Sequence, residues 1–125
     1  MEATLARELY QEHILDLFKH PHNFGTLQGA THTHTENNPL CGDEVTMQVV
    51  VKNERVEDIR FNGYGCAIST ASASLITDKV KGMTKNEVVK MTTDDVLNML
   101  MIPIGPVRLK CALLALETIQ KTVQK

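Results

Sequence analysis

The sequence is poor in aromatic residues and lacks tryptophan. Phe, Tyr and Trp make up 4% of its 125 residues, so stacking on bases or sugars is not an expected mode of recognition. An excess of positive charge is also missing, because 13 Lys and Arg stand against 15 Asp and Glu for a formal net charge of -2. Such a chain has no general attraction for phosphate backbones or acidic lipids, and we expect no nucleic-acid partner.

Long apolar runs and a cysteine framework are missing as well. Uninterrupted apolar stretches such as 49–51 fall far short of the roughly 20 residues that cross a bilayer, so we expect no membrane span. The first residues carry Glu and Asp and show no apolar signal core, which favours a cytoplasmic or an already processed protein. Three cysteines spread along the chain indicate reduced thiols rather than disulfides.

Apolar periodicity predicts helices at both ends of the chain and after its middle. The chain is long enough for one domain with its own core, and we expect a single domain over residues 1–125. Helical spacing is found over 4–18, 68–80 and 106–123. In the last helix the expected apolar face is Leu109, Leu113, Leu116, Ile119 and Val123. Thr84 and Glu87 have capping-box spacing, and a second helix start is expected at Thr92.

The middle of the chain has the pattern of strands. Side chains alternate between apolar and polar over 44–51, a turn is expected at 52–55, and a β-branched run follows to residue 63. Residues 31–35 alternate two side-chain types and could form a short edge strand, although they lack an apolar signal. The order of elements predicts an α+β fold, with helices packed on one face of a small antiparallel sheet.

Each cysteine stands at an expected junction between elements rather than within a periodic apolar face. Cys66 and Cys111 would lie at the positive end of a helix, which favours the reactive thiolate. Cys41 and Asp43 are two residues apart, so their side chains would point the same way in an extended segment. A packing role for each cysteine stays open, because free cysteine is among the most buried residue types.

Three thiolates and one carboxylate form a donor set for a soft metal. Sulfur selects Zn²⁺, Fe²⁺ or iron-sulfur clusters over Mg²⁺ or Ca²⁺. The oxygen of Asp43 exchanges more readily than sulfur, so such a site suits temporary binding. The spacing lacks a paired C-x-x-C, which would make a zinc site specific. Lys110 could favour the neighbouring thiolate, and His32 and His34 could share one strand face and bind metal.

Four segments of the sequence resemble one protein family. They are NPLCGD at 38–43, GYGCAISTASAS at 63–74, VKGMT at 80–84 and PVRLKCALLALETI at 106–119. In this order they resemble the iron-sulfur cluster assembly scaffolds of the IscU and NifU N-terminal type and their SufU relatives. The similarity extends over essentially the whole chain. It implies a three-stranded antiparallel sheet with helices on one face.

The resemblance also implies a function and a set of site residues. A cysteine desulfurase would pass persulfide sulfur to the chain, iron would join it, and a [2Fe-2S] cluster would be assembled and handed to acceptor apo-proteins. Such a scaffold is a carrier rather than an enzyme. Cys41, Cys66 and Cys111 would hold the cluster, or Zn²⁺ or Fe²⁺ in the same site, with Asp43 as the fourth ligand. Cys111 matches the position of the sulfur acceptor.

Departures from the family pattern leave an alternative function open. Lys110 stands where housekeeping scaffolds usually have His; this matches the SufU branch and favours a zinc-dependent sulfurtransferase that accepts persulfide sulfur. The insertion that SufU proteins carry before the last helix is missing between Met91 and Pro106, which favours the scaffold. Residues 104–108, IGPVR, partly resemble the LPPVK segment recognised by a dedicated Hsp70-type chaperone, with Gly105 in place of a proline.

Overall fold

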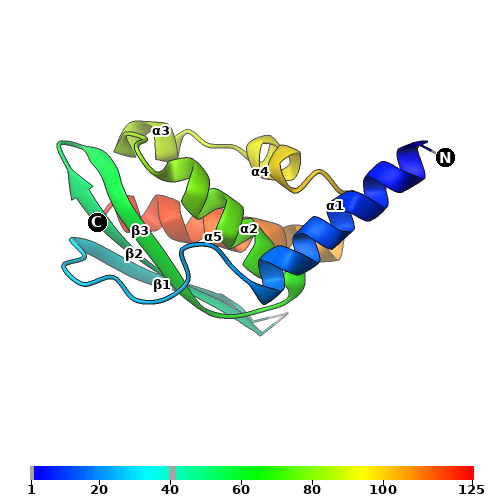
Figure 1. The fold of residues 1–125 in the computed structure, drawn as a ribbon. Helices are drawn as coiled ribbons and strands as arrows, with labels where there is room; N and C mark the ends of the chain where they lie inside the picture. The colour runs from blue at the N-terminus through cyan, green and yellow to red at the C-terminus, as the bar shows by residue number, and fades with distance from the viewer. Residues whose placement is uncertain (1, 40–41) are drawn as a thin grey trace.

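The structure, a computed structural model, describes residues 2–39 and 42–125, with side chains from Gln11 onward. Within these residues the protein folds into a three-stranded sheet and five helices. The elements are α1 (Glu2–Lys19), β1 (His32–Asn38), β2 (Asp43–Lys52), β3 (Arg55–Tyr64), α2 (Ala67–Val80), α3 (Lys85–Val89), α4 (Thr93–Leu100) and α5 (Pro106–Val123). Helices α2 and α5 cover one face of the sheet, and α1 packs on α2 (Figure 1). The expected α+β fold is confirmed.

The sheet is antiparallel in the order β1-β2-β3. Val45, Met47 and Val49 of β2 are buried while the residues between them are partly exposed, as the alternation predicts. The β2–β3 turn consists of Asn53 and Glu54, both with positive φ (54° and 64°). Two left-handed residues match the twist of a tight hairpin, so the predicted turn is confirmed.

Strand β1 is longer than the short edge strand considered from the sequence, and it packs through polar side chains. His32, His34 and Glu36 are half-buried on the side that faces α5. The Glu36 carboxylate accepts a hydrogen bond from Lys121 Nζ at 2.7 Å and contacts His34 Nε2 at 2.8 Å. Lys121, and after it His34, lower the pKa of Glu36. An ion pair therefore joins β1 to α5 where apolar contacts were lacking.

Helices α2 and α5 approach closely through small residues. The buried Ser72 hydroxyl donates a hydrogen bond of 2.6 Å to the carbonyl oxygen of Ala112. The predicted apolar face of α5 is partly wrong, because Leu109 and Leu113 are only half-buried whereas Ala112 is completely buried. The buried face of α5 thus begins at Cys111 and Ala112, where the helix contacts α2, rather than at Leu109.

Polar contacts hold two helix starts and the loop after α1. Both predicted helix starts are confirmed as reciprocal capping boxes, Thr84 with Glu87 and Thr92 with Asp95. The loop after α1 is fastened to α2 at Asp78, which lies 2.6 Å from His22 Nδ1.

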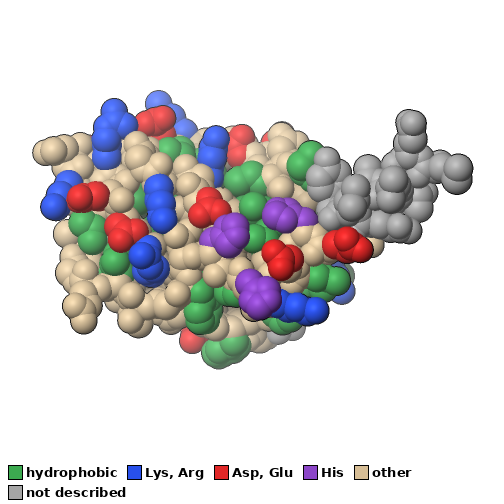
Figure 2. Space-filling view, in the orientation of Figure 1, with side chains coloured by type: hydrophobic (Ala, Val, Ile, Leu, Met, Phe, Trp, Pro, Cys, Tyr) green, Lys and Arg blue, Asp and Glu red, His purple; other side chains and the backbone are tan. Residues whose placement is uncertain are grey.

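On the face shown in Figure 2, histidines lie beside acidic side chains, and Lys and Arg alternate with Asp and Glu. No helix in the described ranges combines the length and apolar character needed to cross a membrane.

Candidate metal centre

Donor side chains from three elements meet at one end of the sheet. Asp43 is the first residue of β2, Cys66 is the N-cap of α2, and Cys111 lies in the second turn of α5. One oxygen of Asp43 and the two sulfur atoms lie within 4.8 Å of one another. Residues far apart in the sequence thus converge. Cys41, the fourth expected donor, lies outside the described residues.

The three donors are largely withdrawn from bulk water. Asp43 and Cys111 are 2% and 3% exposed, and Cys66 is half-buried. Cys111 belongs to the buried face of α5, one turn before Ala115. The expectation that each cysteine avoids a periodic apolar face is therefore wrong for Cys111, because α5 turns its small side chains, this thiol included, toward the core. Cys66 precedes its helix as expected.

The Asp43 carboxylate is held on one side and unsatisfied on the other. Its Oδ1 accepts a hydrogen bond of 3.2 Å from the backbone N–H of Cys66, at the positive end of α2. Its Oδ2 is buried, and among the described residues it has no hydrogen-bond partner. A buried carboxylate oxygen without a partner is costly. A metal ion bound by the two sulfurs would satisfy it, so the donor set fits a soft metal or a cluster.

Gly65 makes room for this arrangement. A Cβ at residue 65 would lie 3.1 Å from Asp43 Oδ1 and 2.2 Å from Ser69 Oγ. The absence of a side chain thus lets the carboxylate and the start of α2 close on each other. Ser69 Oγ donates a hydrogen bond of 3.2 Å to the Cys66 carbonyl. Gly65 and Ser69 therefore shape the site without supplying a donor to it.

The donors line a hollow of about 540 Å³. Its lining residues are Gly42, Asp43, Tyr64, Gly65, Cys66, Val107, Arg108 and Cys111. Tyr64 and Val107 are 65% and 79% exposed, so large side chains stand at its mouth. Sequence reasoning missed Tyr64, Val107 and Arg108 as parts of the site. Arg108 could have been found from its place three residues before Cys111, on the same side of a helix.

The histidines do not join this centre. His32 and His34 do share one face of β1, but His34 is engaged with Glu36. Across the ranges 11–39 and 42–125, the one group of three or more potential metal-ligating side chains within reach of one another is Asp43, Cys66 and Cys111. The histidine alternative therefore has no support in the described part of the chain.

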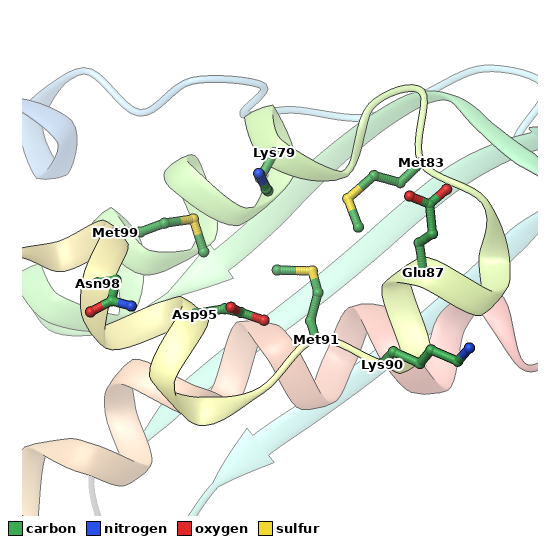
Figure 3. Close-up of a pocket in the computed structure, with 8 residues that line it drawn as sticks. All are labelled: Lys79, Met83, Glu87, Lys90, Met91, Asp95, Asn98 and Met99. Carbon is green, nitrogen blue, oxygen red and sulfur yellow. The ribbon is translucent and has the colours of Figure 1, made fainter.

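A second hollow, of about 520 Å³, lies between α2, α3 and α4. Met83, Met91 and Met99 extend their thioethers into it (Figure 3). Its acidic residues are already used by the capping boxes, since Glu87 accepts from the Thr84 N–H at 3.0 Å and Asp95 from the Thr92 N–H at 2.9 Å. None of the described residues that line this hollow carries a thiol, so the hollow lined by Cys66 and Cys111 is the candidate metal centre.

Fold and donor set together define a class, a small α+β protein with a candidate metal centre of thiol and carboxylate donors. A sequence model of the family described as NifU-like N terminal domain matches residues 9–125. The chain therefore belongs to this family, as the resemblance of its four segments predicts.

Relatives carry names from iron-sulfur cluster assembly. The chain is 34% identical over 115 residues to the iron-sulfur cluster assembly scaffold protein IscU 1 of Archaeoglobus fulgidus, covering 92% of this chain and 74% of the relative. It is 35% identical over 127 residues to the mitochondrial iron sulfur cluster assembly protein 1 of Debaryomyces hansenii, covering 98% and 70%. A crystal structure of a putative scaffold protein for the SUF system from Fervidobacterium islandicum superposes with a TM-score of 0.81 at 28% identity, covering 94% of this chain and 98% of that one.

Proposed function

We propose that this chain is a scaffold on which an iron-sulfur cluster is assembled from iron and desulfurase-derived sulfur and then passed to acceptor proteins. Membership of the family and the names of relatives support it. Within the chain, the observation that carries it is the group of Asp43, Cys66 and Cys111, whose donor atoms lie within 4.8 Å of one another. Such a protein binds and releases a cargo and is not an enzyme in the usual sense.

The cargo can be matched to the donors one by one. Thiolates bind iron-sulfur clusters, Zn²⁺ and Fe²⁺ in preference to harder cations. A [2Fe-2S] cluster takes four donors from the protein, and we assign the fourth place to Cys41. The Oδ2 atom of Asp43, buried and without a hydrogen-bond partner among the described residues, supports this fit, because a bound metal would give it one.

Asp43 and Cys111 would have different roles. Asp43 supplies an oxygen that exchanges more readily than sulfur, so its bond to the cargo is the one that opens first during release. Cys111 is the assigned sulfur acceptor. Since Cys111 is 3% exposed and lines the hollow, a persulfide on it would extend into the hollow, close to the other donors, rather than into bulk water.

The partners of this function follow from the same assignment. A cysteine desulfurase would deliver the sulfur, and apo-proteins would receive the cluster. The scaffold itself would be a single domain of residues 1–125. A cytoplasmic location would keep the thiols reduced. Residues 104–108 run into the first turn of α5 and include the largely exposed Val107. They are the segment that we assign to an Hsp70-type chaperone.

Anaerobic reconstitution tests the proposal. The protein is incubated with a cysteine desulfurase, cysteine, ferrous iron and a dithiol reductant that supplies the electrons to turn persulfide sulfur into sulfide. Thiolate-to-iron charge-transfer absorption is then followed on the protein after gel filtration. We expect the colour to stay with the wild-type chain and to be lost in Cys111→Ser, which keeps the size of the side chain but replaces the thiol. Wild-type protein that stays colourless under these conditions contradicts the scaffold function.

The second candidate function is zinc-dependent sulfur transfer. Lys110, exposed beside Cys111, favours it. In this case Zn²⁺ would occupy the same donors, and sulfur would leave as a persulfide. Tightly held zinc, together with persulfide sulfur that moves to a second protein without any cluster, would select this function over the first.

A further inference from the structure

Three of the six methionines of the chain line one hollow away from the thiol site. Met83 lies between α2 and α3, Met91 between α3 and α4, and Met99 in α4. Figure 3 shows that their thioether groups extend into this hollow, which we call the methionine hollow. The other two methionines whose side chains the structure describes, Met47 and Met101, do not line it. Soft sulfur donors from separate segments are therefore gathered at one place.

The hard donors of the methionine hollow are already engaged. Glu87 and Asp95 each accept a backbone N–H in a capping box, and the hydrogen bond from the Thr84 N–H lowers the pKa of Glu87. Lys79 and Lys90 balance the two carboxylates, so the residues that line the hollow carry no net formal charge. The methionine hollow therefore has no charge excess that would favour a hard divalent cation or repel a soft monovalent one.

The three thioethers suit Cu⁺ and its heavier congener Ag⁺. Thioether sulfur is a soft, uncharged donor that selects Cu⁺ over Mg²⁺ or Ca²⁺. It carries no proton, so binding requires no deprotonation. Methionine is flexible, and its sulfur can close on an ion without a change of the backbone. Met91 is buried while Met83 and Met99 are half-buried, so an ion held by them would be shielded on the core side and reachable from solvent.

We propose that the methionine hollow binds Cu⁺ through the thioether sulfurs of Met83, Met91 and Met99. Three neutral donors would replace the water around the ion and leave its single positive charge unchanged. The inference goes beyond the proposed function and does not depend on it, because the two hollows share no described lining residue. If the methionines only filled space between the helices, leucine would serve equally well and no metal would bind.

Titration of the wild-type protein with Ag⁺ tests this inference. Ag⁺ stands in for Cu⁺ because it neither oxidises in air nor disproportionates, and the NMR signals of carbon-13-labelled methionine methyl groups report which sulfurs bind it. A chloride-free buffer at about pH 5.5 keeps most imidazoles protonated, so that histidines compete little. The thiols take up the first equivalents, and the methionine signals report the next ones. Single Met→Leu variants assign the signals.

We expect the signals of Met83, Met91 and Met99 to move together with one further equivalent, while the signal of Met101, which is 55% exposed, stays in place. Met99→Leu keeps an apolar side chain of similar size but removes one donor. It should weaken Ag⁺ binding by at least about tenfold, since even the loss of an outer-shell partner of a metal ligand costs that much. Met101→Leu, the matched control, should leave the affinity unchanged.

Three outcomes would overturn the inference. A Met101 signal that moves with or before the other three would indicate unselective binding to any accessible thioether. Signals of Met83, Met91 and Met99 that stay in place, or that move at different points of the titration, would exclude a shared site. A Met99→Leu variant that binds Ag⁺ as tightly as the wild type would show that the thioether is only a packing group.

Discussion

The hydrogen bond between Ser72 and Ala112 is predicted to fix the spacing of the two cysteine-bearing helices. Ser72 lies in α2, six residues after Cys66, and the carbonyl that it binds follows Cys111 directly in α5. The bond is short, at 2.6 Å, and Ser72 and Ala112 are both buried. Replacing Ser72 by Ala removes it without adding bulk to the contact.

The expected loss can be estimated from the bond itself. A buried hydrogen bond between neutral groups contributes about 1 kcal/mol net, so Ser72→Ala should lower the free energy of unfolding by about that amount. For a chain of this size the midpoint of thermal unfolding would fall by about 4 °C. Urea unfolding followed by circular dichroism measures the change, with an unchanged m-value as the sign that only stability is affected.

Thr122→Val is the matched control for Ser72→Ala. The Thr122 hydroxyl is equally buried, but it donates to the Thr118 carbonyl within α5 at 2.6 Å and joins no second helix. Both variants should lose stability, but only Ser72→Ala should also weaken zinc binding, because it alone loosens the distance between Cys66 and Cys111. Full stability of Ser72→Ala, or an equal loss of zinc affinity in Thr122→Val, would refute the reasoning.

Three further predictions concern other parts of the chain. Gly63→Ala should lower the free energy of unfolding by about 3 kcal/mol or more, since the φ of Gly63 is 132° and an added Cβ would lie 2.1 Å from the Glu44 carbonyl oxygen. Gly82→Ala is the control: Gly82 also has positive φ but has open space around it, so the loss should be only about 1 kcal/mol. Equal losses of the two variants in urea unfolding would contradict this prediction. The pKa of Glu36 is lowered from 4.5, so its ion pair stabilises the fold above about pH 4.5 and is lost as the pH falls through the lowered pKa. Glu36→Gln should therefore lower the free energy of unfolding by up to about 1 kcal/mol at neutral pH and leave it unchanged in strong acid; the value is small because the lysine partner is half exposed. Urea unfolding at several pH values measures this, and a loss that is independent of pH would exclude the ion pair as its cause. Asp43→Ala should lengthen the lifetime of a reconstituted cluster, measured as decay of its visible absorption, and a shorter lifetime would contradict the role of the exchangeable oxygen.

Local signals made most of the fold predictable. The β2–β3 hairpin and both capping boxes depend on residues a few positions apart, so the sequence carries their cause directly. Strand β1 was underestimated because its stabilising contact is an ion pair from Glu36 to Lys121, 85 residues away. The buried face of α5 was misjudged for the same kind of reason. Its orientation depends on packing against α2 and the sheet, which buries Ala112 and leaves Leu109 and Leu113 half-buried.

The sequence pointed to three donor residues that the fold brings together, but not to the residues around them. The family resemblance and the chemistry of thiols and carboxylates pointed to Asp43, Cys66 and Cys111, and the fold brings these three together. The burial of Cys111 and the place of Arg108 at the hollow depend on the rotation of α5 about its axis. Spacing in the sequence does not fix that rotation; packing against the rest of the fold does.

X-ray absorption at the zinc edge of the loaded protein tests the central claim most directly, because it counts the atoms bound to the metal. The account predicts a first coordination shell dominated by sulfur at about 2.3 Å, with one oxygen at about 2.0 Å that disappears or is replaced by water in Asp43→Ala. A shell of nitrogen and oxygen alone would contradict it, because the thiols that this fold gathers would then not hold the metal.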